Sequence, residues 1–277
     1  MRKLNEIFIK NFHKNGLYRP IIDTVIHDSS LDFQIRDGYI NLYFMGNSIL
    51  NLNENGQVEI NNKFLKGSKF NSKSFLKNED VNNFLLNIPI IKNNVIKVKS
   101  KKPTLEIEYE QLMIRSNNLN KNVNSEIFIT DRQYTDNDNN ARFDLSGFLC
   151  KNRTPKNKSV PLTFIEVKYS LNPDITNIDK QISKYYNSVK NKIDDIAEET
   201  QYLKNLKIDL GLINKPKERL DVLKTLKVSN KIEDVQFIIG LIDYNPNSKK
   251  FNTKILKALP FKNQIKIFKG GFGIWEK

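Results

Sequence analysis

Two apolar runs, RFDLSGFLC (residues 142–150) and PLTFIEVKYS (residues 161–170), constrain this chain most. Each has the length and composition of a core strand, yet Asp144 interrupts the first run and Glu166 and Lys168 interrupt the second. Burying a charged side chain costs free energy unless another group compensates it. These two strands therefore indicate a functional site that brings charged side chains together.

The strand repeat of two residues places Glu166 and Lys168 on one face, and Ile165, Val167 and Tyr169 on the other. The interval KNRTPKNKSVP between the runs is long enough for a hairpin loop, so the two strands can be antiparallel neighbours. Asp144 would then lie beside Glu166. Two carboxylates that close repel each other unless a cation lies between them.

Mg²⁺ prefers oxygen ligands and keeps several waters, so it would compensate such a carboxylate pair. A bound metal lowers the pKa of a coordinated water and draws charge from a phosphate group. The ammonium of Lys168 could position that water or stabilise the developing negative charge. This chemistry needs neither cysteine nor histidine, and the two histidines, His13 and His27, lie far from the runs in the sequence.

An aspartate, an interval of moderate length and a Glu-x-Lys strand, with an acidic residue on an upstream helix, resemble the PD-(D/E)XK nuclease superfamily. The proline that usually precedes the aspartate is replaced here by Phe143. The resemblance implies that Asp144, Glu166 and Glu110 are metal ligands in the catalytic centre and that Lys168 is the catalytic lysine. It also implies Mg²⁺ or Mn²⁺ as the cofactor.

The segment QISKY (residues 181–185) follows the Glu-x-Lys strand and resembles the Gln-x-x-x-Tyr motif of the RecB-like branch of this superfamily. On a helix, Gln181 and Tyr185 are neighbours on one face. The resemblance implies that both help to hold DNA near the metal, and Lys184 is a candidate phosphate contact beside them. The resemblance covers roughly residues 105–190.

Each of these residues also has an ordinary interpretation. Glu-x-Lys occurs on solvated faces of amphipathic strands, and Asp144 could be a turn residue ahead of Ser146-Gly147. Other acids could replace Glu110, and Tyr185 lies on the buried stripe of its helix, where packing explains it equally well. Besides Lys184, further lysines of this helix could contact phosphate or be merely solvated. The competing acids are Glu106, Glu108 and Asp131, and the further lysines are Lys180, Lys190 and Lys192.

The resemblance implies an α/β (α+β) fold, with a restriction-endonuclease-like core in which helices flank a mixed central sheet. We expect strands at 126–134, 142–150, 161–170 and 235–244, helices at 105–116, 178–196 and 215–228, and one more short strand within 263–277. Alternation and the Asn55-Gly56 turn predict an antiparallel, β-rich region before this core. A short helix at 4–12 precedes that region, and another helix ends before Pro89. We place the domain boundary after residue 100, giving domains at 1–100 and 101–277.

The chain carries 45 Lys and Arg against 31 Asp and Glu, a formal charge of +14, so its first expected partner is nucleic acid, with DNA ahead of RNA. A lysine-rich composition of this kind can also arise without selection for binding. The single cysteine, Cys150, excludes an internal disulfide and fits a cytoplasmic location. No stretch has the length of a membrane span or a secretory signal, so no membrane partner is expected. A homodimer is left open.

The sequence therefore predicts a Mg²⁺-dependent phosphodiesterase, a nuclease acting first on DNA, with endonuclease and exonuclease action both open. Bacterial members of this superfamily act in restriction, repair or defence against phage. Two alternatives remain: a catalytically silent module that binds nucleic acid or another partner on the same fold, and a nuclease that cleaves RNA. The β-rich region would contribute substrate or partner binding.

Overall fold

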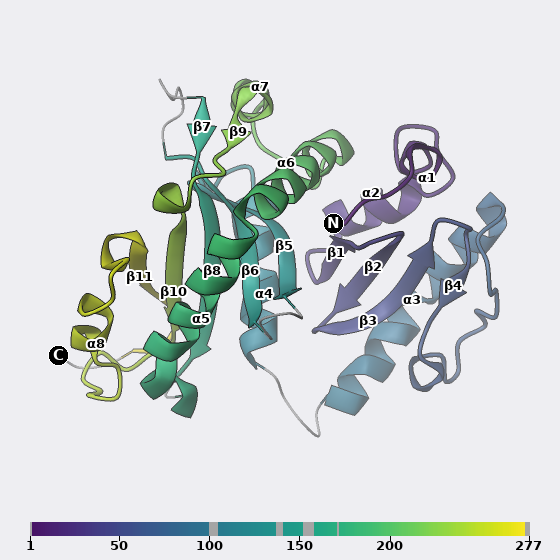
Figure 1. Cartoon of the computed structure of the whole chain (residues 1–277). Coiled ribbons are helices and arrows are strands. Elements are labelled where there is room, and N and C mark those ends of the chain that lie inside the picture. The colour runs from purple at the N-terminus through teal and green to yellow at the C-terminus, as the bar shows by residue number, and fades with distance from the viewer. Residues whose placement is uncertain (1, 100–104, 137–140, 152–157, 171, 275–277) are drawn as a thin grey trace. The chain divides into compact units, whose positions relative to one another are not determined.

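In the computed structural model, the described residues are 2–99, 105–136, 141–151, 158–170 and 172–274. The chain forms two compact units, which Figure 1 colours by residue number. The first comprises Met1–Val123 and Asn205–Pro216, and the second comprises Asn124–Lys204 and Lys217–Lys277. This division differs from the boundary predicted after residue 100. Helix α4 (Leu105–Ile114) groups with the first unit because Ile107 packs against the backbone of Gly46 and α4 packs against β1 (Leu31–Ile35).

The first unit contains the expected antiparallel sheet, with its strands in the order β1-β2-β3-β4. The predicted turn at Asn55-Gly56 is confirmed: Gly56 adopts a φ of +76°, and Leu52 pairs with Val58 across the hairpin. The remaining helices and strands of this unit are α1 (Glu6–Lys10), α2 (Arg19–His27), β2 (Tyr39–Phe44), β3 (Asn47–Asn53), β4 (Val58–Glu59) and α3 (Asn78–Lys99).

The prediction that this helix ends before Pro89 is wrong. Helix α3 continues through Pro89 to Lys99. Proline removes one helical hydrogen bond and usually bends or ends a helix. Here Pro89 lies on the exposed side of α3, where water can satisfy the freed carbonyl group. The opposite side buries Phe84, Ile88 and Ile91, so tertiary packing outweighs the local penalty.

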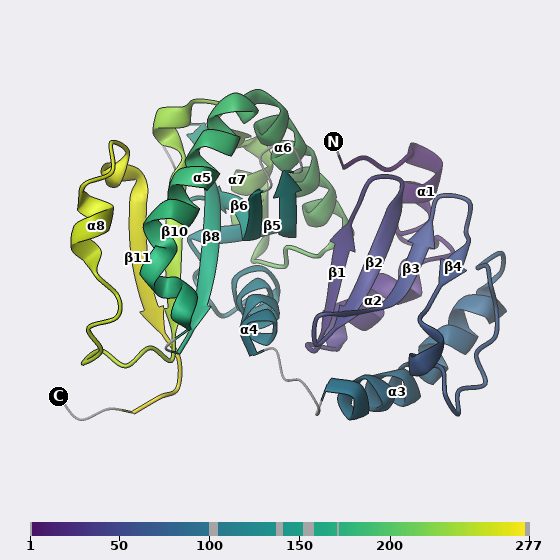
Figure 2. The same ribbon diagram turned by 60° about the horizontal axis from the view of Figure 1, so that its bottom comes forward.

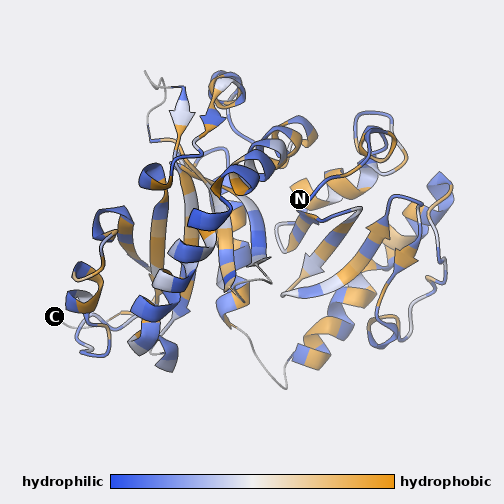
Figure 3. Ribbon diagram, viewed as in Figure 1, coloured by the Kyte–Doolittle hydropathy of each residue, from blue (hydrophilic) through white to orange (hydrophobic). Residues whose placement is uncertain are grey.

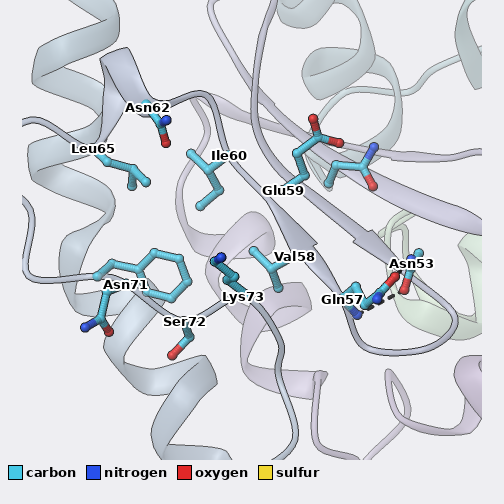
Figure 4. Close-up of a pocket in the computed structure, with 12 residues that line it drawn as sticks. Asn53, Gln57, Val58, Glu59, Ile60, Asn62, Leu65, Asn71, Ser72 and Lys73 are labelled. Atoms are coloured by element: carbon cyan, nitrogen blue, oxygen red, sulfur yellow. Dashed lines mark hydrogen bonds between the residues drawn. The ribbon is translucent and has the colours of Figure 1, made fainter.

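A cavity of about 650 Å³ lies in the first unit between β4, the 3-10 turn Asn62–Phe64 and the segment at 70–73 (Figure 4). Uncharged amides such as Asn51, Asn62 and Asn71 line it, together with apolar side chains that include Val58 and Phe70. None of the residues predicted to be catalytic lines this cavity.

The second unit is built on a mixed five-stranded sheet with the order β11-β10-β8-β6-β5. Strand β6 runs antiparallel to both of its neighbours, β5 and β8, whereas β8, β10 and β11 run parallel to one another. Their bounds are β5 (Ile127–Asp136), β6 (Ala141–Leu149), β8 (Leu162–Tyr169), β10 (Gln236–Ile242) and β11 (Ile265–Gly270). The predicted strands and the mixed α and β class are confirmed.

Helix α5 (Ile178–Asn191) covers one face of this sheet, as Figure 1 and Figure 2 both show. Its apolar stripe, Ile178, Ile182, Tyr185 and Val189, packs against Phe164 and its neighbours on the sheet. Much of α5 is hydrophilic in Figure 3, in keeping with the exposed lysines Lys180, Lys184 and Lys190. The predicted stripe is therefore confirmed, and it fixes which side of α5 faces the sheet.

The helix predicted across 178–196 is two helices, α5 and α6 (Ile193–Leu210). Lys192 leaves the helical conformation, and Asp194 and Asp195 stand in the first turn of α6, where acidic side chains favour a helix start. The second unit also contains α7 (Lys217–Thr225), α8 (Thr253–Lys257) and the short parallel pair β7 (Ser159–Val160) and β9 (Lys227–Val228). Among the helices described, we find none that is both long and apolar enough for a bilayer span.

Candidate active site on strands β6 and β8

Strands β6 and β8 are antiparallel neighbours, as their spacing in the sequence predicts, and Leu145 pairs with Ile165 at the end of their ladder. Asp144 and Glu166 are the next residues on the two strands. Beyond this point the backbone pairing stops, and a side chain connects the two strands instead: Oδ2 of Asp144 accepts a hydrogen bond from the backbone N–H of Val167 at 2.8 Å. Asp144 is thereby fixed to the residue that follows Glu166.

Glu166 and Lys168 lie on the same face of β8, and the Nζ atom of Lys168 is 2.6 Å from Oε1 of Glu166. Both residues are almost fully buried, with 3% and 5% of their surface exposed. Lys168 is therefore a cation that compensates the charge of Glu166 within the strand itself. The sequence had suggested a metal ion for this role.

Helix α5 supplies two more groups to the same carboxylate. The Nε2 group of Gln181 donates to Oε1 of Glu166 at 2.5 Å, and the hydroxyl of Tyr185 donates to Oε2 at 2.7 Å. Gln181 also donates to the hydroxyl of Tyr185 at 2.7 Å, which confirms that the two side chains share one face of the helix. Glu166 is thus held by donors on both of its oxygens.

Tyr185 is buried and also contacts the carbonyl oxygen of Arg142 on β6 through its hydroxyl group. Its ring lies 4.2 Å from that of Phe143, measured between centroids. Burial, followed by the negative charge of Glu166, raises the pKa of Tyr185 well above its ordinary value. The phenol therefore stays protonated and remains a hydrogen-bond donor, and in this structure it orients Glu166.

The other two predicted residues, Lys184 and Glu110, are on helices α5 and α4. Lys184 is exposed on α5, where it is accessible to a phosphate group. Glu110 is buried in α4, which belongs to the first unit, so its place in the metal shell stays a prediction. Asp131 is buried on β5 and pairs with Ser146 of β6, two residues beyond Asp144.

The described residues contain no group of three or more acidic, histidine or cysteine side chains placed to hold a metal ion. The pair Asp144 and Glu166 nevertheless has the chemistry that Mg²⁺ requires, since this ion is commonly bound through one or two carboxylates, several waters and substrate phosphates. Asp144 is half-buried, whereas Glu166 lies deeper. These two residues could hold the ion at the end of the β6–β8 ladder.

The sequence interpretation left Tyr185 open between DNA binding and packing, and it missed the contact of this residue with Glu166. A tyrosine on an apolar stripe usually finds a partner for its hydroxyl when it is buried, and that rule was the available signal.

The chain matches no family model, no curated protein and no solved structure.

Proposed function

We propose that this chain is a metal-dependent nuclease that hydrolyses phosphodiester bonds, with DNA as its first substrate. The observation that best supports this proposal is the buried Glu166–Lys168 pair on β8 beside Asp144 on β6. A buried ion pair adds little stability compared with apolar residues of similar volume. Stability alone therefore gives no reason to keep two charges inside a core strand, whereas catalysis does.

The proposal includes membership of the PD-(D/E)XK superfamily and a restriction-endonuclease-like core. Asp144 and Glu166 would hold Mg²⁺ or Mn²⁺, with Glu110 as a further ligand. When bound, the metal would supply a water of lowered pKa and withdraw charge from the phosphate. Cytoplasmic action in bacterial restriction, repair or phage defence belongs to the same proposal.

The residues of the chain have separate tasks in this proposal. The ammonium of Lys168 stabilises negative charge that develops on the phosphate or orients the attacking water. Gln181 and Tyr185 hold Glu166 in one orientation through their hydrogen bonds. The phenol of Tyr185 stays neutral and remains a donor to Glu166, because burial raises its own pKa.

One observation favours a second candidate, a catalytically silent module that binds nucleic acid. Both oxygens of Glu166 already accept hydrogen bonds, and Lys168 already compensates its charge. Such a cluster is complete as a structural element without a metal ion. Binding of nucleic acid without cleavage is the behaviour expected of this module.

The test compares cleavage of linear and circular duplex DNA, single-stranded DNA and RNA in Mg²⁺, Mn²⁺ and EDTA. The informative variants are Asp144→Asn, whose amide oxygen can still accept from Val167, and Lys168→Met, which keeps the length of the side chain. The matched controls are Asp174→Asn and Lys227→Met at exposed positions of the same unit. We expect metal-dependent cleavage that falls about 100-fold or more in the two site variants alone.

Each outcome assigns a function. Cleavage restricted to RNA would move the proposal to an RNA nuclease. Salt-sensitive binding with no cleavage of any substrate would establish the silent module and reject the nuclease. Cleavage that survives in EDTA or in both site variants would reject the metal site at Asp144 and Glu166.

A further inference from the structure

Strand β11 and the glycine-rich turn that follows it have no task in the proposed reaction. β11 lies at one edge of the five-stranded sheet, and five of its six residues are exposed. Phe268 on the strand and Phe272 on the turn expose 53% and 84% of their surface. Exposed aromatic side chains beside lysines at a sheet edge indicate a binding site for a ligand that contacts both kinds of side chain.

The register of the parallel strands relates this edge to the candidate active site. Leu241 of β10 pairs with Lys168 of β8 on one side and with Lys269 of β11 on the other. Side chains at paired positions point to the same face of a sheet, so Lys168 and Lys269 share a face. Two strand spacings separate them by roughly 10 Å. Lys269 is exposed and forms no ion pair among the described residues.

The turn after β11 is held in place by Asp243, at the end of β10. Its Oδ1 accepts hydrogen bonds from the backbone N–H groups of Phe272 and Gly273. Gly271 adopts a φ of +130°, and a Cβ atom there would lie 2.1 Å from the same oxygen. The backbone that presents Phe272 to solvent is therefore anchored. The strand register also relates this turn to the candidate site: Gly270 pairs with Ile242 of β10, and Ile242 pairs with Tyr169, the residue after Lys168.

Lysine side chains beside exposed aromatic rings are the groups that bind single-stranded nucleic acid: the cations contact phosphates and the rings stack on bases. A second copy of the chain fits less well on this edge. If two β11 strands paired antiparallel about their centre, Lys266 of one copy would face Lys269 of the other. Like charges directly opposite each other destabilise such a pairing.

We propose that β11 and its turn bind a single-stranded segment of the polynucleotide next to the phosphate held at Lys168. Lys269 contacts a phosphate along that strand, and Phe272 stacks on a base. The surface itself is inferred from β11, whereas its position beside the reacting phosphate rests on the proposed nuclease function.

The test measures binding of a fluorescent single-stranded oligonucleotide and of a blunt duplex to the full chain in EDTA, over a range of salt concentrations. Phe272→Ala and Phe272→Leu should each weaken single-strand binding about tenfold, because leucine keeps apolar surface but lacks a stacking face. Lys269→Gln should weaken binding and lower the slope of log K against log salt by about 0.7. The matched control Lys227→Gln, which also removes one exposed charge, should bind as the unaltered chain does.

Three outcomes would overturn this proposal. The first is single-strand binding that is unchanged in Phe272→Leu and Lys269→Gln. The second is equal weakening of single-strand and duplex binding by Phe272→Leu. The third is a dimer in sedimentation that Phe272→Ala dissociates while single-strand binding persists, because it would assign the edge to a second copy.

The two proposals can fail separately. Binding that depends on β11, without cleavage of any polynucleotide, would remove the nuclease and keep the surface. Cleavage that requires Lys168, with binding independent of Phe272 and Lys269, would remove the surface alone.

Discussion

The ammonium of Lys168 lies 2.6 Å from the carboxylate of Glu166, inside a core strand that is covered on its Glu166 face by α5. Each charge compensates the other, and Gln181 and Tyr185 donate further hydrogen bonds to the carboxylate. Removal of one member leaves its partner buried with an uncompensated charge. The pair should therefore respond to substitution as a unit.

Glu166→Gln should lower the free energy of unfolding by about 3–5 kcal/mol, because Lys168 remains buried without its counter-charge. The double variant Glu166→Gln with Lys168→Met should lose less than the sum of the two single losses, since it removes both charges. Urea denaturation of the four proteins measures the difference. Additive losses would show that the two charges are not coupled.

Tyr185→Phe should change how stability depends on pH. The pKa of Tyr185 is raised in the folded chain, so its phenol stabilises the fold below the unfolded value near 10, and this contribution is lost as pH rises above that value. Between pH 9 and 11 the unaltered chain should therefore lose more unfolding free energy than Tyr185→Phe. Equal losses in denaturant titrations at the two pH values would contradict the buried phenol.

Lys204→Met tests a second buried cation. The Nζ atom of Lys204 donates to the carbonyl groups of Leu223 and Leu226 at the end of α7, and burial lowers the pKa of Lys204 to about 8. Between pH 8 and about 10.5 the unfolded chain binds more protons than the folded chain at this residue, so stability rises with pH.

The unaltered chain should therefore gain unfolding free energy relative to Lys204→Met between pH 8 and 10. At pH 7 the methionine variant should be less stable by about 1–3 kcal/mol, because it leaves the carbonyl groups of Leu223 and Leu226 without this donor. Urea titrations at four pH values measure both effects. A difference in unfolding free energy that stays constant across this range would show that Lys204 is exposed to water rather than buried.

Gly147→Ala should disrupt the β5–β6 pairing. A Cβ atom at Gly147 would lie 2.0 Å from the carbonyl oxygen of Phe128, so the backbone of one strand would have to move. We expect a loss of stability well above the roughly 1 kcal/mol that Gly67→Ala should cost, because Gly67 has a φ of +75° but open space around it. Thermal melts of the two variants make the comparison, and equal melting temperatures would contradict the close approach of β5 and β6.

Local patterns in the sequence predicted most of the strands. A repeat of two residues is enough to place Glu166 and Lys168 together, and a repeat of 3.6 is enough to align Ile178, Ile182, Tyr185 and Val189. Both depend on covalent geometry that does not change with the rest of the fold. The Glu166–Lys168 pair and the face of α5 were therefore predictable.

Other features depend on contacts between distant segments. Helix α3 passes Pro89 because one side of it is buried, and α4 joins the first unit because Ile107 meets Gly46. The hydroxyl of Tyr185 reaches Glu166 only after α5 packs on β6 and β8, and Lys269 shares a face with Lys168 only through the ladder of β10. The sequence by itself determined which side chains each strand and helix presents. Tertiary packing decided which of them meet, because the energy of such contacts is gained only when segments far apart in the chain are brought together.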